Sequence, residues 1–441
     1  MLNALRRGSS RRPRILAATG ACALAATTLA ACGSSGPGAG GDALEVWVYQ
    51  DGSTVIQEEF VERFNEESDI DINLTQIPGE NYQDRMRTAM GGDNAPDIFF
   101  NWGGGSIGDF VAEDMLVDLT DTLASEPEFQ DAFIPSILDA GAIDGRHYGV
   151  PMRGVQPVIL FYNQTLFDDA GLEAPETYDD LLNAIDTFQQ QDLQPIALGG
   201  ADPWTELMWL EYLLDRQGGA DVFETIRNGD SSGWGDPAVL DAAERAADLA
   251  DMGAFGNNYR SVGFTNDAIS TFFGNGDAAM HLMGSWEYSA QLTLNPEFAE
   301  NDLAYTAFPT IEGGAGDASA VVGNPTNYWS VHSSLEAEGE EDRLDAAIEF
   351  LKLMATEDYA QALIDNGDVP TTTNAQELLG SSPNPEFAQW QYDMVANASD
   401  FTLSWDQAVP AQQSDPLVDS IEQLFAEQLT PQEFVDELQN L

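Results

Sequence analysis

Short apolar runs alternate with longer amphipathic segments along most of this chain. Three of the short runs predict β-strands, at residues 44–49, 71–75 and 97–100. Two segments between them, 55–65 and 82–90, repeat their apolar side chains at helical spacing. The order strand, helix, strand, helix, strand is typical of a doubly wound α/β domain with a largely parallel sheet.

The same alternation continues to the C-terminus. Apolar or extended runs predict further strands at 149–162, 195–198 and 278–283. Amphipathic segments predict helices at 178–190, 204–214, 237–251 and 344–354. Thr430-Pro431-Gln432-Glu433 is a capping box that opens a last helix through Leu438. So long a stretch of this pattern exceeds what one sheet holds comfortably, and we expect two α/β lobes.

The first 31 residues differ from the rest. Arginines between positions 6 and 14 form a positive segment, and residues 15–31 follow without a charge. Such a run is short and only mildly apolar, which is typical of a secretory signal peptide rather than a membrane span. It ends in Leu29-Ala30-Ala31-Cys32, which resembles a bacterial lipobox, in which the cysteine is acylated and begins the mature chain. We therefore expect a lipoprotein signal peptide at 1–31, a lipid anchor on Cys32 and a Gly/Ser tether at 32–41.

Two further features of this leader concern redox state and export. Cys22 lies in the segment to be removed, so Cys32 has no partner for a disulfide. Ser10-Arg11-Arg12 permits twin-arginine export as well as the general secretory route, and the sequence leaves that choice open.

Charge narrows the range of partners. The chain has 16 Lys and Arg against 75 Asp and Glu, a net charge of −59, and without residues 1–31 the balance is 11 against 75, or −64. Nucleic-acid binding needs clustered basic side chains, so this excess of acid excludes it, and it disfavours electrostatic docking on anionic lipids. A hydrophobic content of 43% is ample for a large core, so we expect the acids on a solvated surface.

The segment Gly103-Gly104-Gly105-Ser106-Ile107-Gly108 matches two motifs at once. As G-x-G-x-x-G it is typical of dinucleotide sites, and as G-x-S-x-G it is typical of a nucleophile elbow. The dinucleotide motif belongs to the first strand-to-helix turn, whereas this segment follows the third strand. A hydrolase would pair Ser106 with His147, His281 or His332, each of which lies beside apolar or turn residues. The interpretation we favour is a flexible turn that faces a cleft at the strand ends.

The sequence offers no motif for a metal or a cofactor. It has no H-E-x-x-H and no cysteine pair in the mature chain, and residues 69–73 lack the glycine of an EF-hand loop and are better explained by strand alternation. We therefore expect no metal site and no cofactor. Chance pairs among 75 acids are unavoidable, so a two-carboxylate glycosidase stays open as an alternative and no single acid stands out.

Five tryptophans lie in or beside turns rich in Gly, Pro or Asp: Trp102, Trp204, Trp234, Trp286 and Trp405. The apolar face of a pyranose ring lies flat on an indole, while Asp, Asn, Gln and Arg hydrogen-bond its hydroxyls. These turns favour a sugar ligand, and packing of each indole onto the core is an equal alternative. Trp47 and Trp390 fall among apolar residues of a strand or helix, so we expect them in the core.

Six segments carry a resemblance to a known family. They are APDIF at 95–99, GRHYGVP at 145–151, FYNQTLF at 161–167, AGL at 170–172, PIALGG at 195–200, and AAM at 278–280 with GSW at 284–286. Each is weak alone, but their order and spacing over nearly the whole mature chain make the set specific. Together they resemble the extracellular solute-binding lipoproteins of bacterial ABC importers, the family that contains maltose-binding protein.

The resemblance implies a fold and its boundaries. In that family, two α/β lobes joined by a hinge of two or three strands close on a solute in the cleft, and a membrane permease recognises the closed form. The first lobe is then expected at 42–153 and 320–367, and the second at 154–319 and 368–441, with C-terminal helices in the last part. Hinge crossings are expected at 149–153 and near Val321.

The resemblance also implies which residues of the first lobe and the hinge line the cleft. Gln50 and Asp51 end the first strand, and Trp102 and Gly104 follow the third. Arg153 is expected either to donate a bidentate hydrogen bond to ring hydroxyls or to form a structural ion pair at the hinge.

Further cleft residues are implied in the second lobe. Asp202 and Trp204 match a turn of an acid, a proline and an aromatic residue, in which the ring stacks on the sugar. Trp286 with Glu287 matches a second stacking position after Gly-x-Trp. Gln156 stands where maltose-binding protein has a Glu, so the charge departs from the pattern while hydrogen bonding is kept. Three more positions are matched by chain length alone: Asn327, Trp405 and Asp406.

These expectations lead to one function and two alternatives. We expect a lipid-anchored monomer on the extracellular face of the cytoplasmic membrane, which binds a di- or oligosaccharide by lobe closure, delivers it to an ABC permease and has no catalytic activity. The first alternative keeps the fold and binds a cation such as a polyamine, which the acidic surface would attract. The second is a secreted hydrolase that uses Ser106 or a pair of acids.

Overall fold

The computed structural model describes residues 43–441 apart from 80, 81, 93, 228, 229 and 410. The predicted signal peptide at 1–31, the acylation site Cys32 and the tether at 32–41 lie outside the described residues. Within the described part, no helix is both long and apolar enough to cross a membrane.

A five-stranded sheet organises the first lobe, which we call lobe 1. Its strand order is β2 (Ile72–Pro78), β1 (Leu44–Gln50), β3 (Ile98–Asn101), β12 (Tyr328–Val331) and β6 (Val150–Pro151). β1 runs parallel to β2 and β3, as the sequence pattern predicts, and β12 runs antiparallel to β3 and β6. β12 lies far along the sequence, so lobe 1 is built from two separate stretches of chain.

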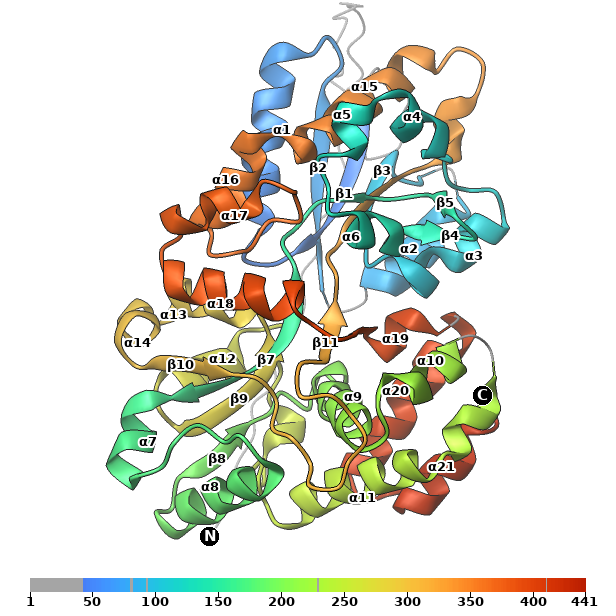
Figure 1. The fold of residues 1–441 in the computed structure, drawn as a ribbon. Helices are drawn as coiled ribbons and strands as arrows, with labels where there is room; N and C mark the ends of the chain where they lie inside the picture. Colours follow the sequence, from blue (N-terminus) through green and yellow to red (C-terminus); the bar gives the residue numbers. More distant parts are fainter. Residues whose placement is uncertain (1–42, 80–81, 93, 228–229, 410) are drawn as a thin grey trace, which may run out of the picture. The chain divides into compact units, whose positions relative to one another are not determined.

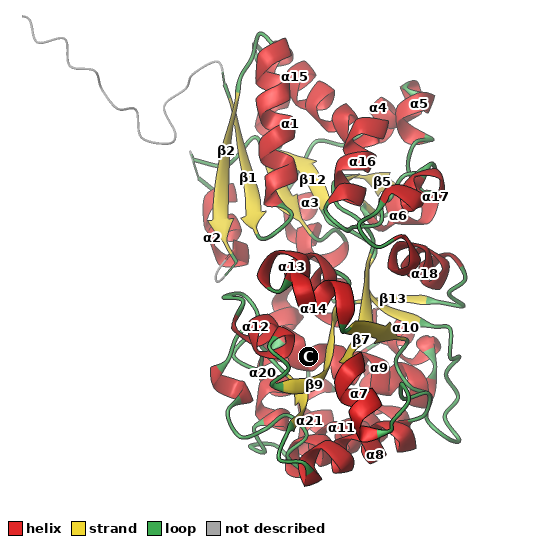
Figure 2. Ribbon diagram, turned by 90° about the vertical axis from the view of Figure 1, so that its left-hand side faces the viewer, coloured by secondary structure: helices red, strands yellow, loops and turns green. Residues whose placement is uncertain are grey.

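Helices pack on this sheet through apolar stripes. Helix α1 (Thr54–Glu67) buries Ile56, Phe60, Val61 and Phe64, the spacing that predicted it, and lies alongside β1 and β2 (Figure 2). A short hairpin of β4 (Ala142–Ile143) and β5 (Arg146–His147) follows the early helices. The remaining helices of this region are α2 (Tyr82–Met90), the 3-10 turn η1 (Gly104–Ile107), α3 (Gly108–Ala112), α4 (Thr120–Ser125), α5 (Pro127–Gln130), α6 (Pro135–Ala140), α15 (Glu341–Lys352), α16 (Glu357–Asp365) and α17 (Ala375–Leu378).

A six-stranded sheet organises the second lobe, lobe 2. Its strand order is β13 (Phe401–Leu403), β11 (Val321–Asn324), β7 (Gln156–Asn163), β9 (Ala278–Gly284) and β8 (Gln194–Ala197), and β10 (Leu303–Thr306) also pairs with β7. Figure 1 shows this sheet with its own set of helices. They are α7 (Gln164–Ala170), α8 (Tyr178–Gln190), α9 (Trp204–Gly218), α10 (Ala220–Arg227), α11 (Pro237–Asp251), α12 (Ala268–Gly274), α13 (Trp286–Leu294), α14 (Pro296–Asn301), α18 (Pro385–Ala396), α19 (Trp405–Ala408), α20 (Ala411–Phe425) and α21 (Pro431–Leu438). The capping box at Thr430 is confirmed at the start of α21.

The chain passes between the two sheets through short extended segments. Residues 152–155 join β6 of lobe 1 to β7 of lobe 2, and residues 325–327 join β11 to β12. The two segments are hydrogen-bonded to each other, because Met152 N donates to the Asn327 carbonyl at 2.8 Å and Thr326 Oγ1 donates to the Arg153 carbonyl at 2.8 Å. β11 pairs with β7 and β13, so the return to lobe 1 follows Asn324, later than the expected boundary at residue 320.

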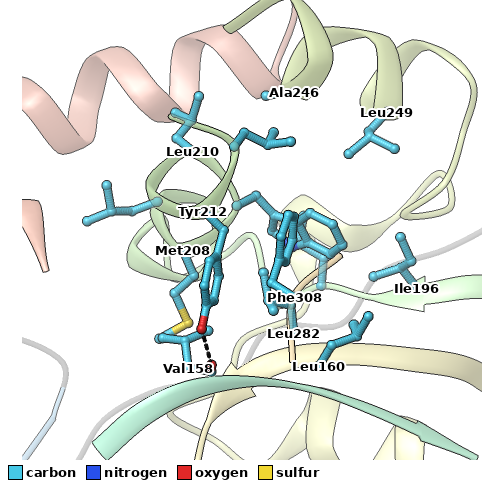
Figure 3. Close-up of a cluster of buried hydrophobic side chains, with 14 of the residues drawn as sticks. Val158, Leu160, Ile196, Met208, Leu210, Tyr212, Ala246, Leu249, Leu282 and Phe308 are labelled. Atoms are coloured by element: carbon cyan, nitrogen blue, oxygen red, sulfur yellow. Dashed lines mark hydrogen bonds between the residues drawn. The ribbon is translucent and has the colours of Figure 1, made fainter. Parts of the chain in front are cut away.

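Each lobe has its own apolar core. That of lobe 2 packs the β7–β9 sheet against α9, where Tyr212 Oη donates to the Val158 carbonyl at 2.7 Å and stacks on Phe308 with ring centroids 4.7 Å apart (Figure 3). That of lobe 1 is a separate cluster around β1, β3, α1 and α15. Two cores confirm the prediction of two α/β lobes.

Helix α9 is buried on all sides, including its charged residues. Every residue from Thr205 to Arg216 is buried, and Arg216 offsets its burial by pairing with Asp215 and donating to the carbonyls of Ala318 and Ala320. Glu211 Oε1 accepts from Ser404 Oγ and from Trp405 N, both at 2.8 Å.

Glu206, earlier on the same helix, has a different environment. Neither of its carboxyl oxygens has a hydrogen-bond partner among the described residues. Burial raises the pKa of Glu206 to about 9, with a further increase from Glu422 and an opposing effect of Arg260. Burial likewise raises the pKa of Glu211 to about 8, against the hydrogen bonds from Trp405 and Ser404. Both side chains are therefore neutral acids at pH 7.

We expect the free energy of unfolding to fall as pH rises from about 5 to 9. Across this window the folded chain keeps the protons of Glu206 and Glu211, whereas the exposed side chains of the unfolded chain have lost them. Each retained proton lowers the free energy of unfolding by about 1.4 kcal/mol per pH unit between the unfolded and folded pKa values. Urea unfolding at a series of pH values should show this slope, and Glu206→Gln and Glu211→Gln should each flatten it.

Glu433→Gln is the matched control. Hydrogen bonds from Thr430 lower the pKa of Glu433, so its contribution is present above its ordinary pKa and is lost only at lower pH. The slope between pH 5 and 9 should therefore stay as in the wild type. Equal slopes in the wild type and in both buried-site variants would contradict the prediction.

Candidate functional site

The carboxyl ends of β1 and β3 meet at one edge of the lobe 1 sheet, because the two strands are parallel. Gln50 is the last residue of β1 and Asp51 follows it, and both are exposed, whereas Trp102 follows β3 and is half-buried. Asp51 is oriented by its own turn, since its Oδ1 accepts from Ser53 N at 2.9 Å and its backbone N–H donates to Thr54 Oγ1 at 3.0 Å. A carboxylate is thus fixed beside an indole at the end of the sheet.

Arg153 holds the other oxygen of this carboxylate. Its side chain is 3% exposed, and its Nη1 donates to Asp51 Oδ2. Its Nη2 lies 3.4 Å from both the Tyr49 carbonyl and Gln57 Oε1, and its guanidinium lies 5.4 Å from the centre of the Phe100 ring. Of the two roles expected for Arg153, this geometry corresponds to the hinge ion pair.

A second carboxyl group lies behind this ion pair. Asp368 Oδ2 accepts from Asn366 Nδ2 at 3.0 Å and from Ser53 Oγ at 3.3 Å. Burial raises the pKa of Asp368 to about 6, against the opposing effects of the Asn366 hydrogen bond and Arg153, and with a further increase from Asp51. The base of the site therefore contains one guanidinium and two carboxyl groups.

Trp102 belongs to an aromatic cluster on lobe 1. Its ring lies edge-on to those of Phe100, Tyr82 and Tyr49, with centroids 4.9, 5.6 and 5.7 Å away. Tyr82 Oη donates to the Phe100 carbonyl at 2.7 Å, which fixes the cluster to β3. The cluster gives this end of the sheet a stiff apolar wall.

A small cavity of about 30 Å³, partly open to solvent, lies between this wall and lobe 2. Asp406 of α19 lines it, and its Oδ1 has no hydrogen-bond partner among the described residues. Burial raises the pKa of Asp406 to about 6, against hydrogen bonds from nearby groups that include Ser404 and Gln407. The other lining residues include Tyr82, Arg87, Phe100, Asn101, Trp102, Ser106 and Val409.

The acid-Pro-aromatic turn of lobe 2 is built around Asp202. Asp202 Oδ2 accepts from the backbone N–H groups of Phe264 and Thr265, at 2.7 and 2.9 Å. The loop thus held carries the Phe264 ring, which Trp204 meets edge-on at 5.4 Å. Trp204 and Trp286 are both half-buried, with ring centroids 6.3 Å apart. The Asp202 carboxylate therefore fixes the loop against which Trp204 packs, and Trp204 in turn lies beside Trp286.

The turn around Asp202 meets the end of β1 across the lobes. The Tyr49 hydroxyl lies close to Thr265, since both side chains border Gly79, and it lies within the electrostatic reach of Asp202. Burial raises the pKa of Tyr49 to about 12, with further increases from Asp51 and Asp202 and an opposing effect of Arg153. No motif in the sequence singles out Tyr49 or Thr265. Tyr49 is one of three partly buried residues that alternate with buried ones along β1, and that alternation was the available signal.

Two of the expected site residues face the core of lobe 2 instead. Glu287 is 0% exposed, and its carboxylate accepts from Ser270 Oγ at 2.7 Å and from Gln291 Nε2 at 2.6 Å. Successive helical residues point about 100° apart, so Glu287 turns inward while Trp286, at the start of α13, stays at the surface.

Trp405 is 1% exposed and packs on Phe223 and Trp234, with ring centroids 5.2 and 5.4 Å away. For Trp234 and Trp405, packing onto the core is therefore the interpretation that corresponds to the structure. Of the two residues expected in the core, Trp390 packs on Tyr305, and Trp47 is partly buried against the core of lobe 1.

Gln156 and Asn327 lie in or next to the crossings and contact each other. Gln156 Nε2 donates to Asn327 Oδ1 at 2.9 Å, and Asn327 is buried while Gln156 is partly exposed. Gly104 begins η1 with a φ of +53°, in the turn after β3.

Ser106 and the histidines do not form the arrangement of a hydrolase. The Ser106 hydroxyl donates to the Gly103 carbonyl at 2.6 Å. His147 lies 3.8 Å from Asp139, His281 lies 3.5 Å from Glu287, and His332 Nδ1 lies 2.9 Å from Ser334 Oγ. None of these contacts involves Ser106. Among the described residues, no group of three or more His, Cys, Asp or Glu could hold a metal ion.

Comparison with known proteins relates this geometry to a family. Residues 49–361 match the model of the family described as bacterial extracellular solute-binding protein. The chain is 25% identical to the xylose/arabinose-binding protein XacG of Haloferax volcanii over 62% of this chain and 59% of that protein. It is 25% identical to the multiple sugar-binding protein of Streptococcus mutans over 55% of each. The chain spans about half the length of the curated relatives it matches.

Solved structures extend the likeness to nearly the whole chain. A chitin oligosaccharide binding protein superposes with a TM-score of 0.80 at 26% identity, over 91% of this chain and 98% of that one. A protein from work on xylan utilization by the thermophilic bacterium Caldanaerobius polysaccharolyticus gives the same TM-score and identity, over 90% and 99%. With the family model covering well over half of the sequence, the chain belongs to the bacterial extracellular solute-binding protein family.

Proposed function

We propose that this chain captures a di- or oligosaccharide between its two lobes and delivers it to the permease of an ABC importer. The observation that carries the proposal is the position of the Asp202–Trp204 turn, which meets the carboxyl end of β1 through the contact of Tyr49 with Thr265. Partly exposed indoles at 204 and 286 and the fixed carboxylate of Asp51 offer what a sugar needs, namely apolar faces and hydrogen-bond acceptors. The names of the sugar-binding relatives support the same class of solute.

The proposed contacts divide between direct and supporting residues. Five side chains contact the solute directly: Asp51, Trp102, Trp204, Trp286 and Asp406. Arg153 and Asp202 act through the groups that they hold, and the pair of Gln156 and Asn327 offers amide groups at the crossings. Glu287 and Trp405 support the walls from inside lobe 2.

We also propose how the chain is exported, how it is anchored and how it divides into lobes. A signal peptide at 1–31 is removed, and Cys32 is acylated and tethers a monomer to the outer face of the cytoplasmic membrane. The lobes consist of 42–153 with the stretch from β12 through α17, and of 154–324 with the C-terminal part. The chain has no catalytic activity, and ATP hydrolysis belongs to its transport partners. The Ser106 hydroxyl donates its hydrogen bond to the Gly103 carbonyl and not to a histidine, which disfavours the hydrolase alternative.

A thermal shift panel tests the class of solute. A chain that begins at residue 33 is heated with mono-, di- and trisaccharides and with spermidine. A ligand at 100 times its dissociation constant adds about 2.7 kcal/mol to the free energy of unfolding, which raises the melting temperature by several degrees. We expect a rise with at least one oligosaccharide and no dependence on salt between about 0.05 and 0.5 M, because a neutral sugar is not screened.

The panel also contains the outcomes that would contradict the proposal. A response to spermidine alone, weakening as salt is added, would replace the sugar by a cation in the same fold. If no compound changes the melting temperature, and the chain turns over a chromogenic ester in a reaction that Ser106→Ala abolishes, the result would favour the hydrolase.

Variants at the indoles test the proposed contacts. Trp204→Ala and Trp286→Ala should each lower the affinity for the bound sugar at least about tenfold by calorimetry, because each removes a stacking face. Trp390→Phe is the control, since Trp390 lies in α18 and packs on Tyr305 of β10, and it should keep the wild-type affinity. If the control loses as much affinity as the two alanine variants, the assignment of 204 and 286 to the sugar is wrong.

A further inference from the structure

The glycine turn after β3 packs directly on a segment of lobe 2. A Cβ atom placed on Gly105 would lie 2.9 Å from the Gln407 carbonyl oxygen and closer still to that of Val409. A Cβ atom on Gly104 would lie 3.3 Å from the Gln407 oxygen and 3.2 Å from Leu403 Cδ2. The two lobes therefore meet backbone to backbone, at a distance that only glycine permits at position 105.

The lobe 2 side of this contact is held firmly. Glu211 of α9 accepts from Ser404 Oγ and Trp405 N, which ties the start of α19 to the buried helix. The Trp405 ring is stacked on Phe223 inside the core. Residues 404–409 therefore move with lobe 2, and they cannot give way to an added methyl group by a change of rotamer.

Two polar contacts flank the glycine contact and also join the lobes. Gln412 Nε2 of α20 donates to Asp109 Oδ1 and Oδ2 of α3, at 2.9 and 3.0 Å. Arg87 of α2 pairs with Asp415 of α20 at 3.2 Å. We call this set the glycine seam: Gly104, Gly105, Asp109 and Arg87 of lobe 1 against 404–409, Gln412 and Asp415 of lobe 2.

We propose that the glycine seam is the docking surface that sets the closed state of the lobes, and that Gly105 is a positioning residue for solute capture. The inference rests on the proposed function, in which closure holds the solute. The seam consists entirely of protein groups, so it contributes to closure whichever solute is bound. It also assigns a role to the Gly-rich motif at 103–108, which needs neither a nucleotide nor a nucleophile.

Space at Gly105 limits how closely the lobes can approach each other. Gly105 is not among the residues with positive φ, so alanine suits its backbone and only the facing carbonyl oxygens exclude the methyl group. Relief of that overlap requires the seam to separate, which rotates the lobes apart about the crossings at 152–155 and 325–327. A population shift away from the closed state lowers the apparent affinity for every solute by the same factor.

Gly105→Ala is the test variant and Gly108→Ala is its matched control. Gly108 belongs to the same motif, but a Cβ atom there would have no neighbour within 4 Å. We expect Gly105→Ala to keep the wild-type melting temperature without sugar, to lower the affinity for all bound sugars by a common factor on the order of tenfold, and to increase the radius of gyration measured by X-ray scattering in saturating sugar. Gly108→Ala should change neither affinity nor radius.

Gln412→Ala tests the lobe 2 side of the glycine seam, because it removes the hydrogen bonds to Asp109. Its side chain is exposed, so the substitution leaves the core intact, and we expect an affinity loss of a few-fold in the same direction. Wild-type affinity and radius in Gly105→Ala would overturn the seam while leaving sugar binding in place. If the wild type binds no sugar at all, the proposed function fails, and the radius without ligand decides the seam: a larger radius in Gly105→Ala than in Gly108→Ala supports it, and equal radii overturn it.

Discussion

The burial of one guanidinium constrains how this chain passes between its lobes. Arg153 remains charged when it is removed from water, so its burial is offset only while Asp51, the Tyr49 carbonyl and Gln57 stay in place. Its own carbonyl accepts from Thr326 in the second crossing. The end of β1 and the two crossings are thereby joined, and the walls of the candidate site are placed relative to this junction. Replacing Asp51 would leave the guanidinium of Arg153 buried without its charged partner.

Acidic side chains near the site divide into two kinds. Asp202 and Glu211 accept from backbone N–H groups and hold loops, and Glu287 accepts from side chains inside the core. Asp51 and Asp406 present oxygens toward exposed or hollow space. This division shows why 75 acids in the sequence could not be ranked by composition: a carboxylate that binds a loop and one that faces a ligand have the same letter and often the same neighbours.

The fold could be predicted because its signals are local and periodic. Apolar spacing located α1 and the parallel strands β1, β2 and β3, and the length of the pattern indicated two lobes. The site was predictable only where a residue follows a strand end or a recognisable turn, as Asp51, Trp102 and Trp204 do. Trp405 lies in a turn by sequence but is buried by Phe223, a partner far away in the chain. The contact of Tyr49 with Thr265 joins different lobes, so no pattern along the sequence could reveal it.

The way in which Asp202 holds its loop has a consequence for how specificity can change. Within the described part of the chain, its carboxylate accepts hydrogen bonds from the main chain of residues 264 and 265, and main-chain groups are common to every amino acid. The rings that lean on that loop can therefore be exchanged without dismantling it. Descendants of such a scaffold could acquire new nutrients by replacing a few surface rings, and a protein engineer could convert it into a sensor for another sugar by the same substitutions, with the framework left untouched.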